Sequence, residues 1–254
     1  MVHSFYFVLP LSNPNPRCPQ FHLNILANLG AKSIAADCSS NIRDKVVLIT
    51  GVSLGSLGVE FAVIISKHAP DLIILANRDG KISPTVNQYK EKIDVLVKNA
   101  GIMARPYKQT PDGVENQLDT NHNGKTYDPW LAYGQAKTAN MLFYILLASK
   151  MSKKGLIPVS LYSGAIPTGL VSNIGEDGFA SLVAMDHNLA QGIATHVFAA
   201  FHDSITTSRQ TQWRYLDDSK LVAAEKIYPW GRDPIDAESL WKLSEEIVGE
   251  KFEY

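Results

Sequence analysis

The chain has 254 residues, of which 45% are hydrophobic and 19% are charged, so it can form one globular domain with a substantial core. A net charge of −1 gives no reason to expect nucleic acid or an anionic membrane surface as a partner. The two cysteines, Cys18 and Cys38, form neither a disulfide framework nor a metal-ligand cluster. We therefore expect a reducing, cytoplasmic setting, no metal site and no membrane span.

The first 32 residues differ from the rest of the chain. The apolar stretch 5–9 is short and lacks the basic flank and the small-residue cleavage site of a signal peptide. Four prolines between residues 10 and 19 exclude regular structure after it. We expect residues 1–32 to be a poorly ordered extension, rather than a targeting signal, and residues 33–254 to be the domain.

The segment from Lys45 to Asp79 has the pattern of a strand, a turn, a helix and a second strand. Val46–Ile49 is a short apolar run rich in β-branched residues, which is typical of a strand buried on both faces. A glycine-rich turn follows, then a helical spacing that ends at Pro70 and a second apolar run, Leu72–Leu75. This order predicts the first βαβ unit of a dinucleotide-binding fold.

The turn has residues suited to a pyrophosphate. Gly51 and Gly58 let backbone N–H groups approach a ligand, and the following helix directs its partial positive charge at the same point. At the end of the second strand, Arg78 suits the 2′-phosphate of NADP(H), although the neighbouring Asp79 would suit NAD(H). The sequence predicts NADP(H) binding over NAD(H); an ordinary tight turn is the alternative.

The remaining elements predict a Rossmann-like, doubly wound parallel sheet covered by helices on both faces, in a single α/β domain. A third apolar run ends in Asn99-Ala100-Gly101, at the sheet edge where ligands bind in such folds. The other expected elements are a short helix from Thr110 to about residue 121, a helix over 131–151, a strand over 156–161, a helix over 181–201, a strand over 213–216 and a helix over 236–248.

Tyr133 and Lys137 lie four residues apart on the clearest helix, so both side chains project from one face. Such a pair also arises by chance, as a partly exposed tyrosine beside a solvated lysine. Its chemistry nonetheless suits acid–base catalysis, because an adjacent ammonium and a cationic nicotinamide would both lower the pKa of the phenol. Tyr133 could then exchange a proton with a substrate oxygen.

Four motifs in order resemble the short-chain dehydrogenase/reductase family, and most of all its fungal branch similar to retinol dehydrogenases and WW-domain oxidoreductases. They are the segments 50–58 (TGVSLGSLG), 99–101 (NAG), 120–122 (TNH) and 133–137 (YGQAK). The resemblance implies NAD(P)(H)-dependent oxidation or reduction of a small alcohol, aldehyde or ketone.

The resemblance also implies roles for individual residues. Tyr133 would be the acid–base group, Lys137 would hold the nicotinamide ribose and lower the tyrosine pKa, and Asn121 would hold a water in the proton relay. The cofactor would be bound by Gly51, Ser53, Ser56, Leu57, Gly58, Arg78, Asn99, Ala100, Gly101, Tyr133, Lys137 and Thr168.

Two gaps separate the chain from the family pattern. The family has a strand with a catalytic serine before the tyrosine helix, and here His122 leads directly into the segment that precedes that helix. A second strand, between Asp79 and Ile93, also has no counterpart. We therefore expect activity to be impaired. The alternatives are a truncated, non-catalytic dinucleotide-binding protein and an interaction module on the same scaffold.

Overall fold

The structure, a computed structural model, describes residues 3–8, 30–76, 92–109, 113, 128–166, 168–171, 189–207 and 214–252. Its strands are β1 (His3–Val8), β2 (Val46–Thr50), β3 (Leu72–Ala76), β4 (Val95–Lys98), β5 (Ile157–Tyr162), β6 (Tyr215–Asp217) and β7 (Lys220–Leu221). Its α-helices are α2 (Ala31–Asp37), α3 (Ser39–Ile42), α4 (Leu57–Ile65), α6 (Pro129–Met151), α8 (Leu189–Phe201), α9 (Asp203–Thr207) and α10 (Pro234–Val248). Five 3-10 turns complete the set: η1 (Ser66–His68), η2 (Ser152–Lys154), η3 (Gly169–Val171), η4 (Ala224–Lys226) and η5 (Pro229–Gly231).

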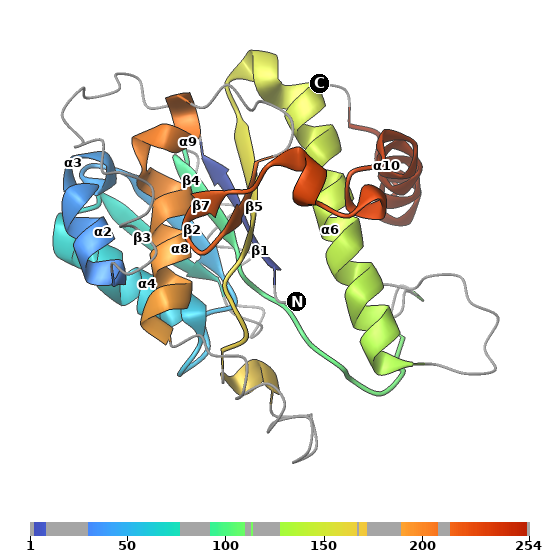
Figure 1. Ribbon diagram of the computed structural model, residues 1–254, viewed down its shortest axis with the longest axis horizontal. Helices are drawn as coiled ribbons and strands as arrows, with labels where there is room; N and C mark the ends of the chain where they lie inside the picture. The colour runs from blue at the N-terminus through green and yellow to red at the C-terminus, as the bar shows by residue number, and fades with distance from the viewer. Residues whose placement is uncertain are drawn as a thin grey trace.

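The strands form one mixed sheet with the order β3-β2-β4-β1-β5-β6-β7 (Figure 1). β2 runs parallel to β3 and β4, and β5 runs parallel to β6. β1 is antiparallel to both of its neighbours, and β7 is antiparallel to β6. The expected Rossmann-like arrangement of parallel strands is confirmed for β3-β2-β4, whereas the N-terminal strand enters the middle of the sheet in the reverse direction. The described residues between β3 and β4, and between β4 and α6, add no strand to this sheet.

Alternate residues of the central strands pack into two different layers, as the period of two of a β-strand requires. Val47 and Ile49 of β2 are fully buried in the main core, and Val97 of β4 joins them there. Val46 and Leu48 point to the opposite face, where they pack with Ile74 of β3. Burial on both faces explains why these strands are continuous apolar runs.

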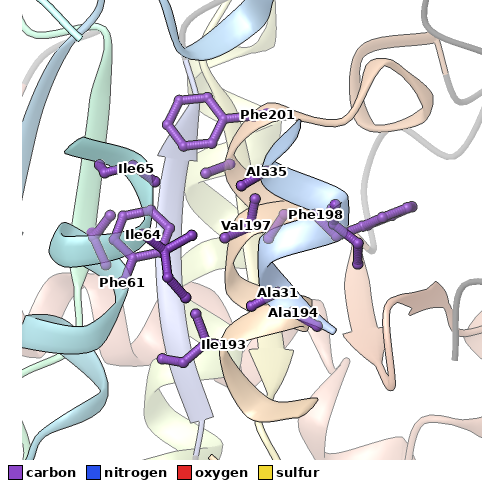
Figure 2. Packing of buried hydrophobic residues seen from close by; sticks show 14 of the residues in the cluster. Ala31, Ala35, Phe61, Ile64, Ile65, Ile193, Ala194, Val197, Phe198 and Phe201 are labelled. Atoms are coloured by element: carbon purple, nitrogen blue, oxygen red, sulfur yellow. The ribbon is translucent and has the colours of Figure 1, made fainter. Parts of the chain in front are cut away.

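Helices α2, α4 and α8 cover one face of the sheet and contribute most of the main core (Figure 2). Phe61 of α4 is fully buried, and its ring stacks on Phe201 of α8 with 6.2 Å between centroids. Phe198 is buried in the same layer and stacks on His202 at 4.2 Å. This layer holds α4, and with it the glycine turn, against β2.

Helices α6 and α10 pack against each other on the opposite side of the sheet (Figure 1). The rings of Phe143 and Trp241 stack with 5.3 Å between their centroids, surrounded by Leu142, Leu146 and Leu147. This contact fixes the C-terminal half of α6, while the N-terminal half of that helix reaches the edge of the sheet where Tyr133 lies.

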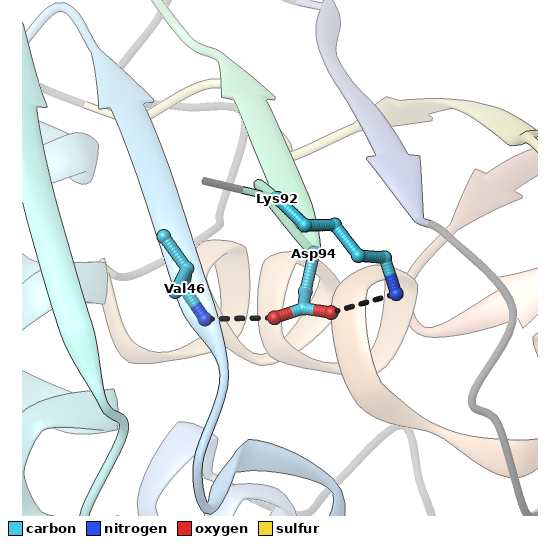
Figure 3. Close-up of polar contacts among 3 residues, drawn as sticks. All are labelled: Val46, Lys92 and Asp94. Carbon is cyan, nitrogen blue, oxygen red and sulfur yellow. Dashed lines mark hydrogen bonds and ion pairs between the residues drawn. The ribbon is translucent and has the colours of Figure 1, made fainter. Parts of the chain in front are cut away.

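Asp94 joins β4 to β2 at the end of the sheet that is remote from the glycine turn (Figure 3). Its carboxylate accepts a hydrogen bond of 3.0 Å from the backbone N–H of Val46 and lies 3.3 Å from the Lys92 ammonium. Because Lys92 is largely exposed, the ion pair contributes little, and the backbone contact does most to fix the register.

Three expectations from sequence need correction or restriction. His3–Val8 form a strand inside the sheet, within the segment expected to be a poorly ordered extension; the division of the chain at residue 32 stays a prediction. The segment 33–44, for which no element was expected, contains α3 and most of α2. The helix expected from Thr110 to residue 121 lies almost wholly outside the described residues, as does the 181–188 part of the helix expected over 181–201.

Candidate functional site

The glycine turn after β2 is held in its shape by close backbone contacts. Gly51 has a φ of +74°, and a Cβ atom there would lie 2.6 Å from both Cα and N of Ala100. A Cβ atom on Gly58 would lie 2.8 Å from Nδ2 of Asn99. Only glycine fits these two positions, because β2 and β4 carry their connecting turns to within contact of each other.

Polar side chains of the predicted set hold this turn together. The Ser56 hydroxyl caps α4 by accepting a 3.3 Å hydrogen bond from Val59 N–H, and it donates to the carbonyl of Gly51 at 3.0 Å. The Asn99 amide donates to the carbonyls of Thr50 and Gly51 at 3.3 and 3.0 Å. Ser56 and Asn99 therefore shape the turn through the backbone.

Thr50 was not among the predicted site residues, although it begins the first family motif. Its hydroxyl oxygen accepts hydrogen bonds from the backbone N–H groups of Asn99 and Ala100, at 3.1 and 3.2 Å. The hydroxyl lies 3.3 Å from the carbonyl oxygen of Val97, to which it donates. The signal available in the sequence was its place at the carboxyl end of a buried strand.

The two other turn residues differ in exposure. Leu57 is buried as the first residue of α4, whereas Ser53 is exposed beside the almost fully exposed Leu54. The exposed loop, the positive φ of Gly51 and the N-terminus of the nine-residue helix α4 together fit a dinucleotide pyrophosphate. Backbone N–H groups of this turn would hold it.

The structure brings Lys137 next to the third motif. A Cβ atom on Gly101 would lie 3.4 Å from the Lys137 ammonium nitrogen, which places that nitrogen at the turn after β4. Lys137 is buried, and burial lowers its pKa to about 8. The ammonium lies 5.3 Å from the ring centre of Tyr133.

Tyr133 is almost completely buried, with 3% of its surface exposed, and packs against Met103 and Leu170. Burial raises the pKa of its phenol, and the nearby Tyr162 raises it further. The sequence had led us to expect a lowered pKa from Lys137 and a nicotinamide. From the chain's own residues alone, desolvation outweighs the lysine, so Tyr133 is a neutral phenol at pH 7. Among the described residues, its hydroxyl has no hydrogen-bond partner.

Two further residues reach the same edge of the sheet. Tyr162 ends β5 and acts electrostatically on Tyr133; its position at the end of a buried strand could have identified it from sequence. Thr168 accepts a 3.4 Å hydrogen bond from Leu170 N–H, and Leu170 packs in the cluster that contains Tyr133. The predicted residues Arg78 and Asn121 lie outside the described residues.

Other site types find no support in the part of the chain that the structure describes. No group of three His, Cys, Asp or Glu side chains there could hold a metal ion. In the same ranges, no helix combines the length and the apolar character needed to cross a bilayer. His196 is fully buried within α8, where burial lowers its pKa to about 4 and its Nδ1 lies 2.7 Å from the carbonyl oxygen of Gly192.

Known proteins resemble this chain over most of its length, although a comparison with protein-family models gives no match. Short-chain dehydrogenase/reductase prx1 from Penicillium roqueforti is 25% identical over 84% of this chain and 87% of that protein. A Streptomyces antibioticus protein named as an oxidoreductase is 24% identical, covering 87% of this chain and 94% of its own. Retinol dehydrogenase 14 from Homo sapiens is 25% identical over 64% of this chain and 60% of its own length.

A crystal structure of an uncharacterized protein from Mycobacterium paratuberculosis shares the fold. The TM-score is 0.53 at 20% sequence identity, and the match covers 84% of this chain and 97% of that one. Together with the sheet, its flanking helices and the glycine turn, these similarities show a Rossmann-like α/β fold and a sequence similar to proteins named as short-chain dehydrogenase/reductase, retinol dehydrogenase or oxidoreductase.

Proposed function

We propose that the chain is an NADP(H)-dependent oxidoreductase that interconverts a small alcohol and the corresponding aldehyde or ketone in a cytoplasmic setting. The observation that carries the proposal is the approach of the Lys137 ammonium to Gly101, beside Tyr133 and facing the turn that begins at Gly51. One acid–base pair and one dinucleotide turn thus share an edge of the sheet.

Each part of the chain has a separate task in this proposal. The turn from Gly51 to Gly58 binds the pyrophosphate, and Arg78 accepts the 2′-phosphate. Lys137 donates to the nicotinamide ribose, since its nitrogen lies at the turn after β4. When bound, a nicotinamide dinucleotide supplies hydride transfer.

Tyr133 handles the proton. A neutral phenol can donate its proton to a carbonyl oxygen, and the raised pKa keeps Tyr133 in that form. Lys137 has a pKa of about 8, so it is mostly protonated at pH 7 and can stabilise the phenolate that forms. Asn121 completes the proton path through a water.

A second candidate is a protein that binds NADP(H) without turnover. The observation in its favour is the burial of Tyr133, whose pKa is raised where catalysis as a base needs it lowered. In the sequence pattern, the serine-bearing strand of similar proteins also has no counterpart, and loss of one such donor typically costs about 10²–10³ in rate.

Titration of the purified chain with NADPH, followed by the fluorescence of the cofactor, tests binding. Consumption of NADPH with a panel of aldehydes and ketones then separates the two candidates, because saturable binding without consumption selects the second.

Replacing Tyr133 by Phe tests the assignment of the proton donor. We expect turnover to fall by about 10²–10⁴ while NADPH binding persists, because only the hydroxyl is removed. Tyr144→Phe is the matched control. Tyr144 is also a buried tyrosine of α6, but it lies in the C-terminal half of that helix, away from the glycine turn. Unchanged turnover in Tyr133→Phe would show that another group transfers the proton.

A further inference from the structure

β1 is the central strand of the sheet, although it comes from the N-terminus of the chain. Three strands lie on each side of it, β3-β2-β4 and β5-β6-β7 (Figure 1). β1 pairs with β5 from His3 to Val8 and with β4 from Phe5 to Val8. β4 and β5 do not pair with each other, so they are held apart by two strand spacings, or about 10 Å.

The two halves of the sheet carry different parts of the site. β2, β4 and α4 carry the glycine turn and the segment Asn99-Ala100-Gly101. β5 ends in Tyr162, and α6, which packs on β5, carries Tyr133 and Lys137. The backbone pairing of β1 is therefore the sheet contact that sets the distance between these two groups of residues.

β1 also satisfies backbone groups in the interior of the molecule. Tyr6 is paired with Val97 and Val159, two residues that are fully buried. Without β1, the facing edges of β4 and β5 would be left with unpaired N–H and C=O groups, at about 1–3 kcal/mol each. Closing the gap would instead move the halves by about 5 Å, far beyond the displacement of about 1 Å that can cost 10²-fold in rate.

We propose that His3–Val8 act as a positioning strand for the site, by holding Tyr133 and Lys137 at the correct distance from the glycine turn. The strand acts through its backbone pairing with β4 and β5. Of the tests that follow, only the measurements of kcat rest on the proposed function, because the placement of β1 can be tested without turnover.

A disulfide tests the placement of the strand in the full-length chain. Phe7 lies directly opposite Leu96, so the double variant Phe7→Cys/Leu96→Cys should form an intramolecular disulfide on oxidation. Phe5 is two positions away from that register, so Phe5→Cys/Leu96→Cys should not form one. A disulfide in the second variant, or one between two chains in the first, would overturn the assigned position; peptide mapping by mass spectrometry distinguishes these outcomes.

The same cross-link tests the role of the strand while the fold is preserved. If β1 occupies this position during turnover, oxidised and reduced Phe7→Cys/Leu96→Cys should have kcat values within about threefold of each other. A loss of more than about tenfold on oxidation that is reversed by reduction would show that β1 has to leave, and would overturn the proposal.

Proline substitution removes the pairing locally. Tyr6→Pro loses a backbone N–H and should lower kcat by about 100-fold or more. The Kd for NADPH should change much less, since the proposed contacts to the phosphates all belong to one half and only the Lys137 contact belongs to the other. Tyr6→Val, which keeps the N–H, is the control and should retain kcat within about tenfold. Faster hydrogen exchange of the backbone amides in residues 95–98 and 157–162 of Tyr6→Pro would support the proposal even if no substrate is found. Unchanged exchange in these two strands, together with an unchanged kcat, would contradict the proposal.

Discussion

Gly51 makes one of the tightest backbone contacts of the site, and this contact decides what the position tolerates. A methyl group there would meet Ala100 at 2.6 Å in a backbone conformation with a φ of +74°. Gly51→Ala should therefore destabilise the chain by about 1–3 kcal/mol and weaken NADPH binding at least tenfold. Urea unfolding and NADPH titration measure the two effects.

Gly134→Ala is the matched control for this substitution. Gly134 lies inside α6, where a Cβ atom would meet nothing within 4 Å. Alanine there should stabilise the chain by about 0.5–1 kcal/mol, since glycine is unfavourable within a helix. If both substitutions had the same effect, the close contact of Gly51 with Ala100 would not be the cause.

His196 makes stability depend on pH. Its pKa in the folded chain is about 4, below the ordinary value of 6.5, because burial disfavours the charged ring more than the Gly192 carbonyl favours it. The unfolded chain therefore binds more protons, and the stability present above pH 6.5 is lost as the pH falls towards 4. The expected loss from this group is about 3 kcal/mol.

Urea unfolding of the unmodified chain and of His196→Asn, at pH 7 and pH 4.5, isolates this contribution. The asparagine can keep a donor near the Gly192 carbonyl but does not titrate, so the variant should lose less stability on acidification. An equal loss in both chains would mean that other groups account for the acid sensitivity.

Sequence predicted the site residues that local patterns define. The spacing of Tyr133 and Lys137 placed both on one helix face, and the structure brings Lys137 to Gly101. The place of Thr50 and Tyr162 at the ends of buried strands could have indicated both residues, but their partners lie on strands distant in sequence, so the contacts themselves could not be predicted. Burial raises the pKa of Tyr133 in the chain's own surroundings, and burial is a property of the packed molecule that no local pattern indicates.

At the scale of elements, buried strands and long helices were the most predictable. β2, β3, β5, α6 and α10 occur where apolar runs or helical periodicity indicated them, within one or two residues at most of their ends. α3 and most of α2 were missed because the segment is short and polar. β1 was missed because prolines follow it and because its partners are β4 and β5, which are about 90 and 150 residues away.

The contact between α6 and α10 should contribute strongly to stability. Trp241 is 5% exposed, stacks on Phe143 and donates from Nε1 to a Glu245 carboxylate oxygen at 2.9 Å. Trp241→Ala should lower the free energy of unfolding by about 3–5 kcal/mol, because it leaves a cavity between the helices. Leu243→Ala, at a position 40% exposed on the same helix, should change it by about 0.5 kcal/mol or less.

Denaturant unfolding of both variants at one pH gives this comparison. If Trp241→Ala and Leu243→Ala lowered the free energy of unfolding by similar amounts, α10 would be only loosely attached, and the C-terminal half of α6 would be held by the sheet alone.

For the whole molecule, the succession of strand, helix and strand predicts the α/β class. It does not predict the direction of the central strand, because pairing between distant segments is decided by which buried edges need a partner. In this chain the edges of β4 and β5 are filled by His3–Val8.

Ligand binding provides a test of the whole molecule, because a ligand that binds only the folded chain raises the melting temperature. At a concentration of 100 times its Kd, NADPH should add about 2.7 kcal/mol, equivalent to a rise in Tm of about 5–10 °C for a domain of this size. NADH at the same concentration should raise the Tm less, since Arg78 then has no 2′-phosphate to bind. In Gly51→Ala, the rise in Tm that NADPH causes, measured relative to the same variant without ligand, should be mostly lost. Equal rises with both cofactors would contradict the preference for NADP(H), and no rise with either would contradict dinucleotide binding itself.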